Sequence, residues 1–250
     1  MHPSAGETDR HPVLFTRAWP KGEIVEGFDE WQRTKHIPEL VLAPGVVSAA
    51  YYRLVTEDVP EALQSFGLRM AAYTGRDLPG LYAFVSSEET AAAVADGSGW
   101  FDRFNELDFA PYTGNVYTVD CVARADGAQA GPELPLLVER FEVDPPGAVV
   151  FDDWLRHEHV HQMAELPGAV RARTFSAVRE GIPIPYYYSP GNRMLAVEFA
   201  DLAGLYRSLS GDALWAAIED SMRWDRRLGY VKRELFEHVL HSYSAHEGAY

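Results

Sequence analysis

The sequence has little cysteine and no long apolar run. Cys121 is the only cysteine among 250 residues, so neither an intrachain disulfide nor a cysteine-rich zinc site can form. A run of 18 apolar residues is absent, which argues against a membrane-spanning helix. The first twelve residues lack the apolar centre of a secretory signal and are predicted to be a disordered lead. There is also no Walker loop and no G-x-G-x-x-G stretch. We therefore expect a cytoplasmic protein without a nucleotide-binding loop.

Positive charge is scarce as well. The chain has 22 Lys and Arg residues against 37 Asp and Glu, a formal net charge of -15. Such a surface repels the phosphates of nucleic acids and anionic lipids, so we expect neither nucleic acid nor a membrane as a partner. Aromatic residues, by contrast, make up 12% of the chain. They can fill a core, or they can build a flat apolar pocket with polar ends that suits an aromatic small molecule.

An internal repeat is the strongest pattern in the sequence. Residues 28–47 and 151–170 align without a gap and are identical at eight of 20 positions. The identical pairs are Phe28/Phe151, Asp29/Asp152, Trp31/Trp154, Arg33/Arg156, His36/His159, Pro44/Pro167, Gly45/Gly168 and Val47/Val170. The same offset aligns 13–19 with 136–142 and places Arg17 opposite Arg140. A period this long does not fit a solenoid and indicates two copies of one small domain.

Both copies have the same predicted order of elements, β-α-β-β-α-β, which is the ferredoxin-like unit of the α+β class. The predicted strands are 13–19, 47–56, 81–85 and 115–123 in the first copy, and 136–143, 170–179, 195–199 and 229–236 in the second. The predicted helices are 28–42, 87–95 and 100–107, then 151–165, 201–209 and 212–227. Residues 57–80 are interpreted as an insertion that is partly helical.

These elements predict five segments along the chain. They are a lead (1–12), a first ferredoxin-like repeat (13–123), a linker (124–135), a second repeat (136–240) and a C-terminal tail (241–250). Each repeat has a single sheet with helices on one face, so its other face needs a cover. Two repeats in one chain can cover each other, packed sheet to sheet.

One motif carries a family resemblance. Each copy has a tryptophan, a histidine five residues later and a Pro-Gly before a strand: Trp31, His36 and Pro44-Gly45, then Trp154, His159 and Pro167-Gly168. This pattern resembles the dimeric α+β barrel superfamily, especially its EthD and antibiotic-biosynthesis monooxygenase branches. The second copy departs from it, because His161 stands where the first copy has Pro38. The resemblance implies a tandem-fused pseudo-dimer, and the chain is also similar in length and duplication to fused oxygenases that open or contract angucycline rings.

The superfamily hosts several chemistries, so the resemblance implies a fold more firmly than a reaction. Some members oxidise polyketides to quinones without metal or haem. Others are polyketide cyclases, lactone isomerases or aldoxime dehydratases, and the chlorite dismutase and dye-peroxidase branches bind haem.

Three histidines lie in the segment 152–163. A helical wheel with 100° per residue places His159 and Glu158 within the apolar arc of the helix. His157 and His161 fall at its edge or outside it, and no third ligand accompanies them, so no metal site is predicted. His159 has two interpretations. It is a structural core histidine, as its twin His36 indicates, or an acid–base group in a pocket between helix and sheet.

Further candidates lie near the second repeat's sheet. The loop 181–194 could fold over a flat ligand or form a rigid hairpin with outward tyrosines. Tyr187 would point opposite to its neighbours, and Asn192 and Arg193 could donate to ligand oxygens. Arg140 needs either a carboxylate or a ligand oxyanion as its partner. Cys121 is expected to pack as a small hydrophobe.

These observations and the resemblance predict an oxygenase of secondary metabolism that acts on an aromatic, polyketide-like molecule with O₂. The reaction would be hydroxylation, quinone formation or oxidative ring opening. The predicted site has His159 and Glu158 as catalytic residues, with Trp154, Tyr187, Asn192, Arg193, Arg140 and His161 as substrate-binding residues. The resemblance implies that no cofactor is required, or that reduced flavin (FMN or FAD) takes part.

Three alternatives remain open at this point. A redox-neutral cyclase, dehydratase or isomerase could use the same histidine as base. A haem-binding barrel protein and a non-catalytic ligand carrier are the others. We expect a monomer with an internal pseudo-dimer, or a homodimer.

Overall fold

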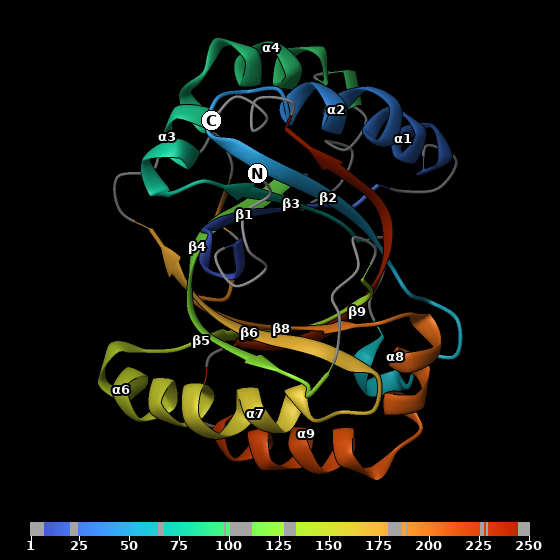
Figure 1. Cartoon of the computed structure of the whole chain (residues 1–250), viewed down its shortest axis with the longest axis vertical. Helices are drawn as coiled ribbons and strands as arrows, with labels where there is room; N and C mark the ends of the chain where they lie inside the picture. The colour runs from blue at the N-terminus through green and yellow to red at the C-terminus, as the bar shows by residue number, and fades with distance from the viewer. Residues whose placement is uncertain are drawn as a thin grey trace.

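Eight strands form a closed barrel in the computed structural model of the chain (Figure 1). The structure describes residues 8–20, 25–64, 68–97, 99–100, 112–127, 134–179, 187–188, 190–225, 228 and 230–244. The barrel strands are β1 (Val13–Ala18), β2 (Val46–Leu54), β3 (Arg69–Gly75), β4 (Tyr112–Arg124), β5 (Leu136–Glu142), β6 (Ala169–Val178), β8 (Arg193–Phe199) and β9 (Tyr230–Tyr243). A two-residue strand, β7 (Tyr187–Tyr188), pairs in parallel with the start of β4.

The last strand of each repeat joins the two sheets. Around the barrel the order is β1-β3-β2-β9-β5-β8-β6-β4, and β4 pairs back with β1. β4 pairs with β1 of its own repeat and with β6 of the other, and β9 pairs with β5 and with β2 in the same way. All eight of these pairings are antiparallel. The chain is thus a fused dimeric α+β barrel, and the sheet faces that lack helices line its interior.

Helices cover the outer face of the barrel on two opposite sides (Figure 1). The first repeat contributes α1 (Val25–Trp31), α2 (Ile37–Leu40), α3 (Leu78–Ser86) and α4 (Glu88–Asp96). The second contributes α6 (Pro145–Trp154), α7 (Val160–Ala164), α8 (Leu202–Leu209) and α9 (Asp212–Asp225). A π-helical segment joins α1 to α2 (Gln32–His36), and another joins α6 to α7 (Leu155–His159). Short 3₁₀ helices span Thr8–Arg10 and Glu61–Leu63.

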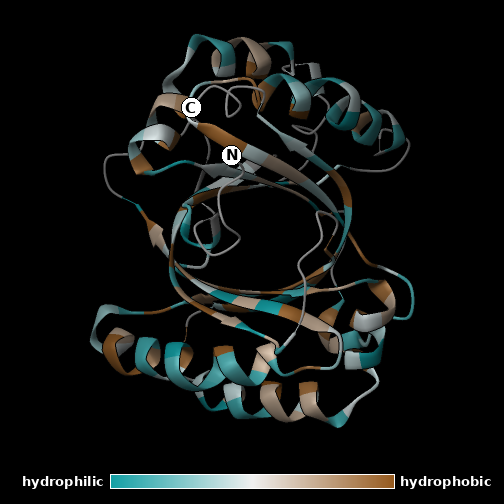
Figure 2. Ribbon diagram, viewed as in Figure 1, coloured by the Kyte–Doolittle hydropathy of each residue, from teal (hydrophilic) through white to brown (hydrophobic). Residues whose placement is uncertain are grey.

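The strands alternate between two apolar layers. Leu14 and Leu137 pack under the helices of their own repeats, whereas Phe15 and Val138 point into the barrel. This alternation follows from the two-residue period of a strand. Figure 2 shows hydrophobic and hydrophilic residues alternating along helices and strands, as expected of elements with one buried side. The molecule therefore has three apolar clusters, one beneath each set of helices and one inside the barrel.

The predicted Pro-Gly stops are confirmed, and each brings two backbones together. Gly45 and Gly168 have φ of 84° and 82°, the left-handed conformation that favours glycine. A Cβ on Gly45 would lie 2.2 Å from the carbonyl oxygen of Gly80, and one on Gly168 would lie 2.5 Å from Cα of Gly204. Only glycine allows this contact between the end of each first helix and the start of a later helix.

The strand predicted at 81–85 is wrong. These residues belong to α3, because Asp77 caps that helix by accepting a hydrogen bond from the Gly80 amide at 2.7 Å. The strand of the first repeat is β3, which lies inside the segment interpreted as an insertion. An apolar run of five residues suits a strand or a buried helix equally, and here the Asp77 cap favours the helix.

Both ends of the described chain are more ordered than predicted. β9 continues to Tyr243, past the expected end of the second repeat, because its last residues pair with β2. Asp9 lies in the expected lead but is buried, and it forms ion pairs with Arg124 and Arg171. Among the described residues, no helix has the length and apolar character to cross a membrane.

Candidate active site beneath the second repeat's first helix

His159 lies between the helices of the second repeat and the outer face of the sheet. Its side chain is fully buried, and its ring stacks on Trp154 with a centroid distance of 4.6 Å. Nε2 lies 2.6 Å from Oε2 of Glu139, and Nδ1 lies 3.4 Å from Oε1 of Gln162. The wheel placed His159 correctly on the buried side of the helix.

The π-helical segment explains both the stacking and one wrong prediction. A π-helix closes i→i+5 hydrogen bonds, so each residue turns less than in an α-helix. Residues five apart, such as Trp154 and His159, therefore come to lie one above the other. The same reduced rotation carries Glu158 out of the apolar arc. Its side chain is 58% exposed and pairs with Arg223 at 3.4 Å.

Glu139 on β5 takes the place at His159 that was predicted for Glu158. Its side chain is fully buried, and its second carboxylate oxygen accepts a hydrogen bond from Nε of Arg233 at 2.6 Å. Arg233 also donates to the hydroxyl of Ser221 on α9 at 2.5 Å. Burial alone raises the pKa of Glu139, but His159 and Arg233 outweigh it and lower that pKa to about 2. Glu139 is therefore ionised at neutral pH.

The ionised carboxylate fixes the state of the imidazole. It can only accept hydrogen bonds, so Nε2 of a neutral His159 carries the proton. Nδ1 is then the basic nitrogen, and it faces the side-chain amide of Gln162. A turn of about 180° in this amide brings its NH₂ group to Nδ1, where it can donate a hydrogen bond. Gln162 is itself exposed. The pair has the arrangement of a base held in one tautomer by a buried carboxylate.

Aromatic rings surround this pair. Trp154 contacts Phe151 and Trp224 with centroid distances of 5.4 and 5.6 Å. Its Nε1 donates to the Asp220 carboxylate at 3.1 Å. Trp154, Phe151 and His159 are each at most 3% exposed, so side chains fill the space beneath the helix. The structure places Trp154, a predicted substrate-binding residue, beside His159 as a packed core residue.

The first repeat has the same histidine without the carboxylate. His36 stacks on Trp31 at 4.3 Å, five residues apart across the matching π-helical segment. The strand position equivalent to Glu139 holds Thr16, and Nδ1 of His36 is buried without a hydrogen-bond partner among the described residues. Burial lowers the pKa of His36 to about 4. Only the second repeat therefore pairs this histidine with a carboxylate.

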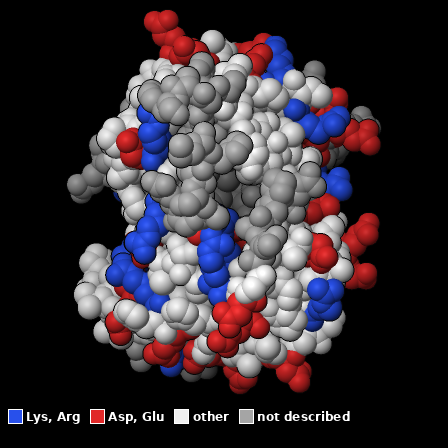
Figure 3. Space-filling model, viewed as in Figure 1, with Lys and Arg blue, Asp and Glu red and all other residues white. Residues whose placement is uncertain are grey.

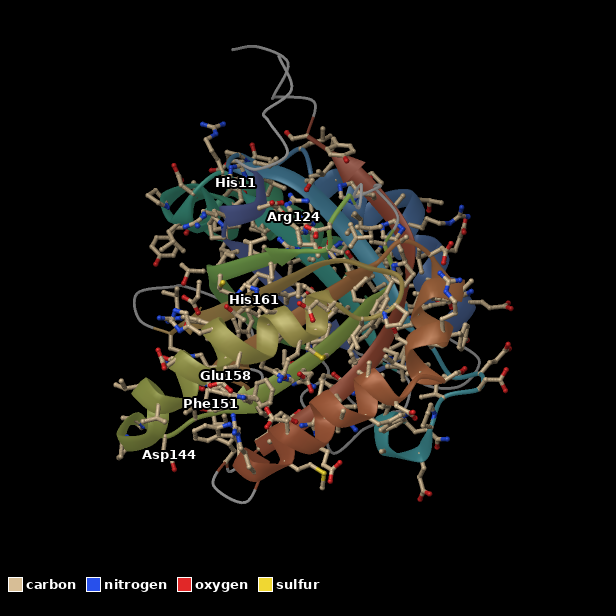
Figure 4. All side chains as sticks on the ribbon, turned by 60° about the horizontal axis from the view of Figure 1, so that its bottom comes forward. His11, Arg124, Asp144, Phe151, Glu158 and His161 are labelled. Carbon is tan, nitrogen blue, oxygen red and sulfur yellow. The ribbon has the colours of Figure 1, made fainter. Side chains whose placement is uncertain are left out.

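His161 and His157 lie on the exposed side of the second repeat's helix. Figure 4 labels His161 and Glu158 on this helix, and both side chains are exposed. His157 pairs with Asp153 at 3.1 Å. Among the described residues, no group of three or more His, Cys, Asp or Glu side chains is placed to hold a metal ion. His161 therefore does not face the buried pair.

The predicted anion-binding residues make contacts within the protein. Arg193 forms a two-fold ion pair with Asp152, with distances of 2.7 and 2.9 Å. Arg69 and Asp29 form the same pair with the same distances in the first repeat. Because both repeats have it, this pair joins helix to sheet, and the predicted substrate-binding residue Arg193 already has a carboxylate partner within the protein.

Asn192 and Arg140 are also occupied within the protein. Asn192 accepts from the Val143 amide at 2.9 Å and donates to the Val143 carbonyl at 2.7 Å. Arg140 points into the barrel and pairs with Glu234 at 2.8 Å, so a carboxylate of the protein is its partner. Neither side chain lies with His159. The side chain of Tyr187 lies outside the described residues.

A second feature lies inside the barrel, on the opposite face of the sheet from His159. A cavity of about 420 Å³ opens where β1, β2, β5 and β6 begin and β3, β4, β8 and β9 end. Its charged lining residues are Arg124, Arg171, Arg173 and Glu198. Figure 3 shows basic side chains gathered near the middle of this view. We call this space the barrel-mouth cavity.

Comparison with solved structures supports the fold. An anthrone oxidase-like protein has a TM-score of 0.66 at 14% identity, and the match covers 96% of this chain and 95% of that one. A candidate monooxygenase from Fusobacterium nucleatum has a TM-score of 0.58 at 9% identity over 94% and 95%. Another from Lactobacillus acidophilus has a TM-score of 0.54 at 11% identity over 93% and 96%. No family model and no curated protein matches the sequence. The chain has the fold of the dimeric α+β barrel superfamily, matched over nearly its whole length.

Proposed function

We propose that the chain is an oxygenase that acts on an aromatic small molecule with O₂, with the second repeat as its working half. The observation that carries the proposal is the pairing of His159 with Glu139, which the first repeat lacks. A histidine with one nitrogen held by an ionised carboxylate has its other nitrogen free to take a proton. The names of the three similar structures favour oxygenation as the class of reaction.

In the proposed reaction Nδ1 of His159 removes a proton from a phenol or from the activated carbon of an anthrone. Displacement of the Gln162 amide gives the substrate access to Nδ1, because that amide is the group facing it. Glu139 stabilises the imidazolium that forms, and Trp154 lies against the imidazole face. The electron-rich anion then reacts with O₂. An anthrone gains one oxygen atom and becomes an anthraquinone, while the other oxygen atom leaves as water.

Glu158 has no part in this proposal, because its carboxylate lies on the surface. The substrate is expected to be aromatic and polyketide-like, and the chain is expected to work without metal or haem. The proposed reaction needs no cofactor, because the substrate anion itself supplies the electrons. Reduced flavin is the alternative electron source.

Oxygen uptake tests this function. The purified chain is mixed with a hydroxylated anthrone in an oxygen electrode, with and without reduced FMN, and products are identified by mass. We expect uptake that His159→Gln reduces at least about 100-fold, since a positioned general base typically contributes 10²–10⁴. Arg33→Gln, an exposed change in the first repeat, serves as control. Uptake unchanged in His159→Gln would overturn the role of the histidine. Turnover without oxygen uptake would assign a redox-neutral cyclase, dehydratase or isomerase reaction.

A further inference from the structure

We propose that the barrel-mouth cavity is a binding site for a monoanionic small molecule with a flat apolar body, such as an aryl carboxylate. This site is distinct from the His159 pair, because the two lie on opposite faces of the sheet. On β5, for example, Leu136 lines the cavity, whereas Glu139 faces the helices and contacts His159. The proposal does not depend on the oxygenase reaction.

The cavity gathers positive charge in a protein whose net charge is -15. Arg171 and Arg173 share the Glu198 carboxylate, with distances of 2.5 and 2.7 Å. Asp9 pairs with both Arg124 and Arg171 at the rim. Three of the four Lys, Arg, Asp and Glu side chains that line the cavity are thus arginines, which favours a ligand with negative charge. The carboxylates of Glu198 and Asp9 already pair with these arginines, so the arrangement favours a single negative charge on the ligand.

Arg173 is the guanidinium best placed to use that charge. Its side chain is 15% exposed, and its Nε is buried without a hydrogen-bond partner among the described residues. One face of the group lies over the Phe175 ring at 5.2 Å. Burial lowers the pKa of Arg173, so its charge is poorly solvated. A carboxylate on the exposed edge of this guanidinium would form a charge-assisted hydrogen bond with a group whose charge is otherwise poorly satisfied.

Small side chains leave room for the apolar body. Ala50, Ala72 and Ala196 point inward from β2, β3 and β8 and line the cavity. Larger side chains fill the barrel beyond them, including Phe175 and Met194, which are fully buried. An eight-stranded barrel is just wide enough to be filled by side chains or to hold one small ligand. The volume of about 420 Å³ lies within the usual range of ligand pockets.

Isothermal titration calorimetry of the full chain tests the proposal with three probes. These are 1-naphthoate, its neutral carboxamide, and 1-naphthyl phosphate near pH 8, where the phosphate is a dianion. We expect 1-naphthoate to bind one per chain and at least tenfold more tightly than the carboxamide. The phosphate should bind more weakly than the carboxylate, because it brings one charge too many. Equal affinity for carboxylate and carboxamide would overturn the proposal.

Variants locate the site. Arg173→Gln should weaken the binding of 1-naphthoate at least tenfold, while Glu198 stays paired with Arg171. Ala72→Leu should abolish binding by filling the cavity without a change of charge. Arg33→Gln is the matched control on the surface and should bind like the wild type. Thermal unfolding of each variant verifies that it is folded.

The result is independent of the oxygenase assay. 1-Naphthoate should bind to His159→Gln as tightly as to the wild type, because the two sites are separated by the sheet. Loss of binding in His159→Gln, or full binding in Ala72→Leu, would show that the ligand lies elsewhere and would overturn the proposal. Binding without oxygen uptake would leave this site intact while the proposed reaction fails.

Discussion

Replacement of Glu139 by glutamine is the sharpest test of the buried network. The change keeps the size of the side chain but removes the negative charge that faces His159 and Arg233. The side chain of Arg233 is 11% exposed and would be left without this counter-charge. Breaking a buried ion pair from one side costs about 3–5 kcal/mol of unfolding free energy. For a chain of this size, that loss corresponds to a fall in Tm of roughly 6–20 °C.

The pH dependence separates an electrostatic effect from a packing effect. The pKa of Glu139 is lowered from an ordinary 4.5 to about 2 in the folded protein. Its contribution to stability is therefore complete above pH 4.5 and is lost as the pH falls towards 2. The difference in Tm between wild type and Glu139→Gln should be large at pH 7 and clearly smaller at pH 3. Circular dichroism during heating measures the Tm of each protein at each pH.

A surface pair provides the control for this experiment. Glu30 pairs with Arg33, but their side chains are 59% and 52% exposed. Glu30→Gln should change the unfolding free energy by no more than about 0.5 kcal/mol at either pH. A loss below about 1 kcal/mol in Glu139→Gln at pH 7, or an equal loss at pH 7 and pH 3, would refute the reasoning.

Three further changes test other parts of the structure. Burial lowers the pKa of His36 to about 4. As the pH falls, this imidazole is therefore protonated in the unfolded chain before it is protonated in the folded protein, and the wild type loses stability between pH 6.5 and 4. His36→Leu should remove up to about 3 kcal/mol of that loss, so its Tm should fall less than that of the wild type as the pH is lowered. Parallel curves of Tm against pH for the two proteins would contradict this. Arg193→Gln breaks the pair with Asp152 and should lower the free energy of unfolding in urea by about 1–3 kcal/mol. An unchanged midpoint of urea unfolding would contradict this. Glu158→Gln should leave oxygen uptake and stability unchanged, and a tenfold fall in uptake would restore Glu158 as a catalytic residue.

Much of the fold could be predicted from the sequence because the repeat shows the same pattern twice. The offset between His36 and His159 led to two ferredoxin-like units, and the barrel confirms them. The Pro-Gly stops were predictable because left-handed backbone requires glycine at Gly45 and Gly168. The β3 strand was missed because an apolar run does not distinguish a strand from a buried helix.

The candidate site was predicted less completely. A wheel with 100° per residue assigned His159 to the buried side but could not foresee the π-helical segment that turns Glu158 outward. Glu139 had a signal that went unused, since it is a charged residue on a strand face that is otherwise apolar. Glu139 and Arg140 are neighbours in the sequence and therefore point to opposite faces of β5, so they cannot pair with each other. Arg233 comes from a strand 94 residues later, and only the folded barrel brings it to Glu139.

The pairing of each repeat's final strand with the other repeat also constrains how the protein folds during synthesis. β9 closes the barrel against β2, so Ser48 comes to lie opposite Tyr243, a residue far away in the sequence. Contacts between such distant residues form slowly, and during synthesis they must wait until β9 has left the ribosome. Until then the first repeat presents an unpaired β2 edge to its surroundings. A nascent chain halted before β9 should therefore be recognised by chaperones or join another copy of itself.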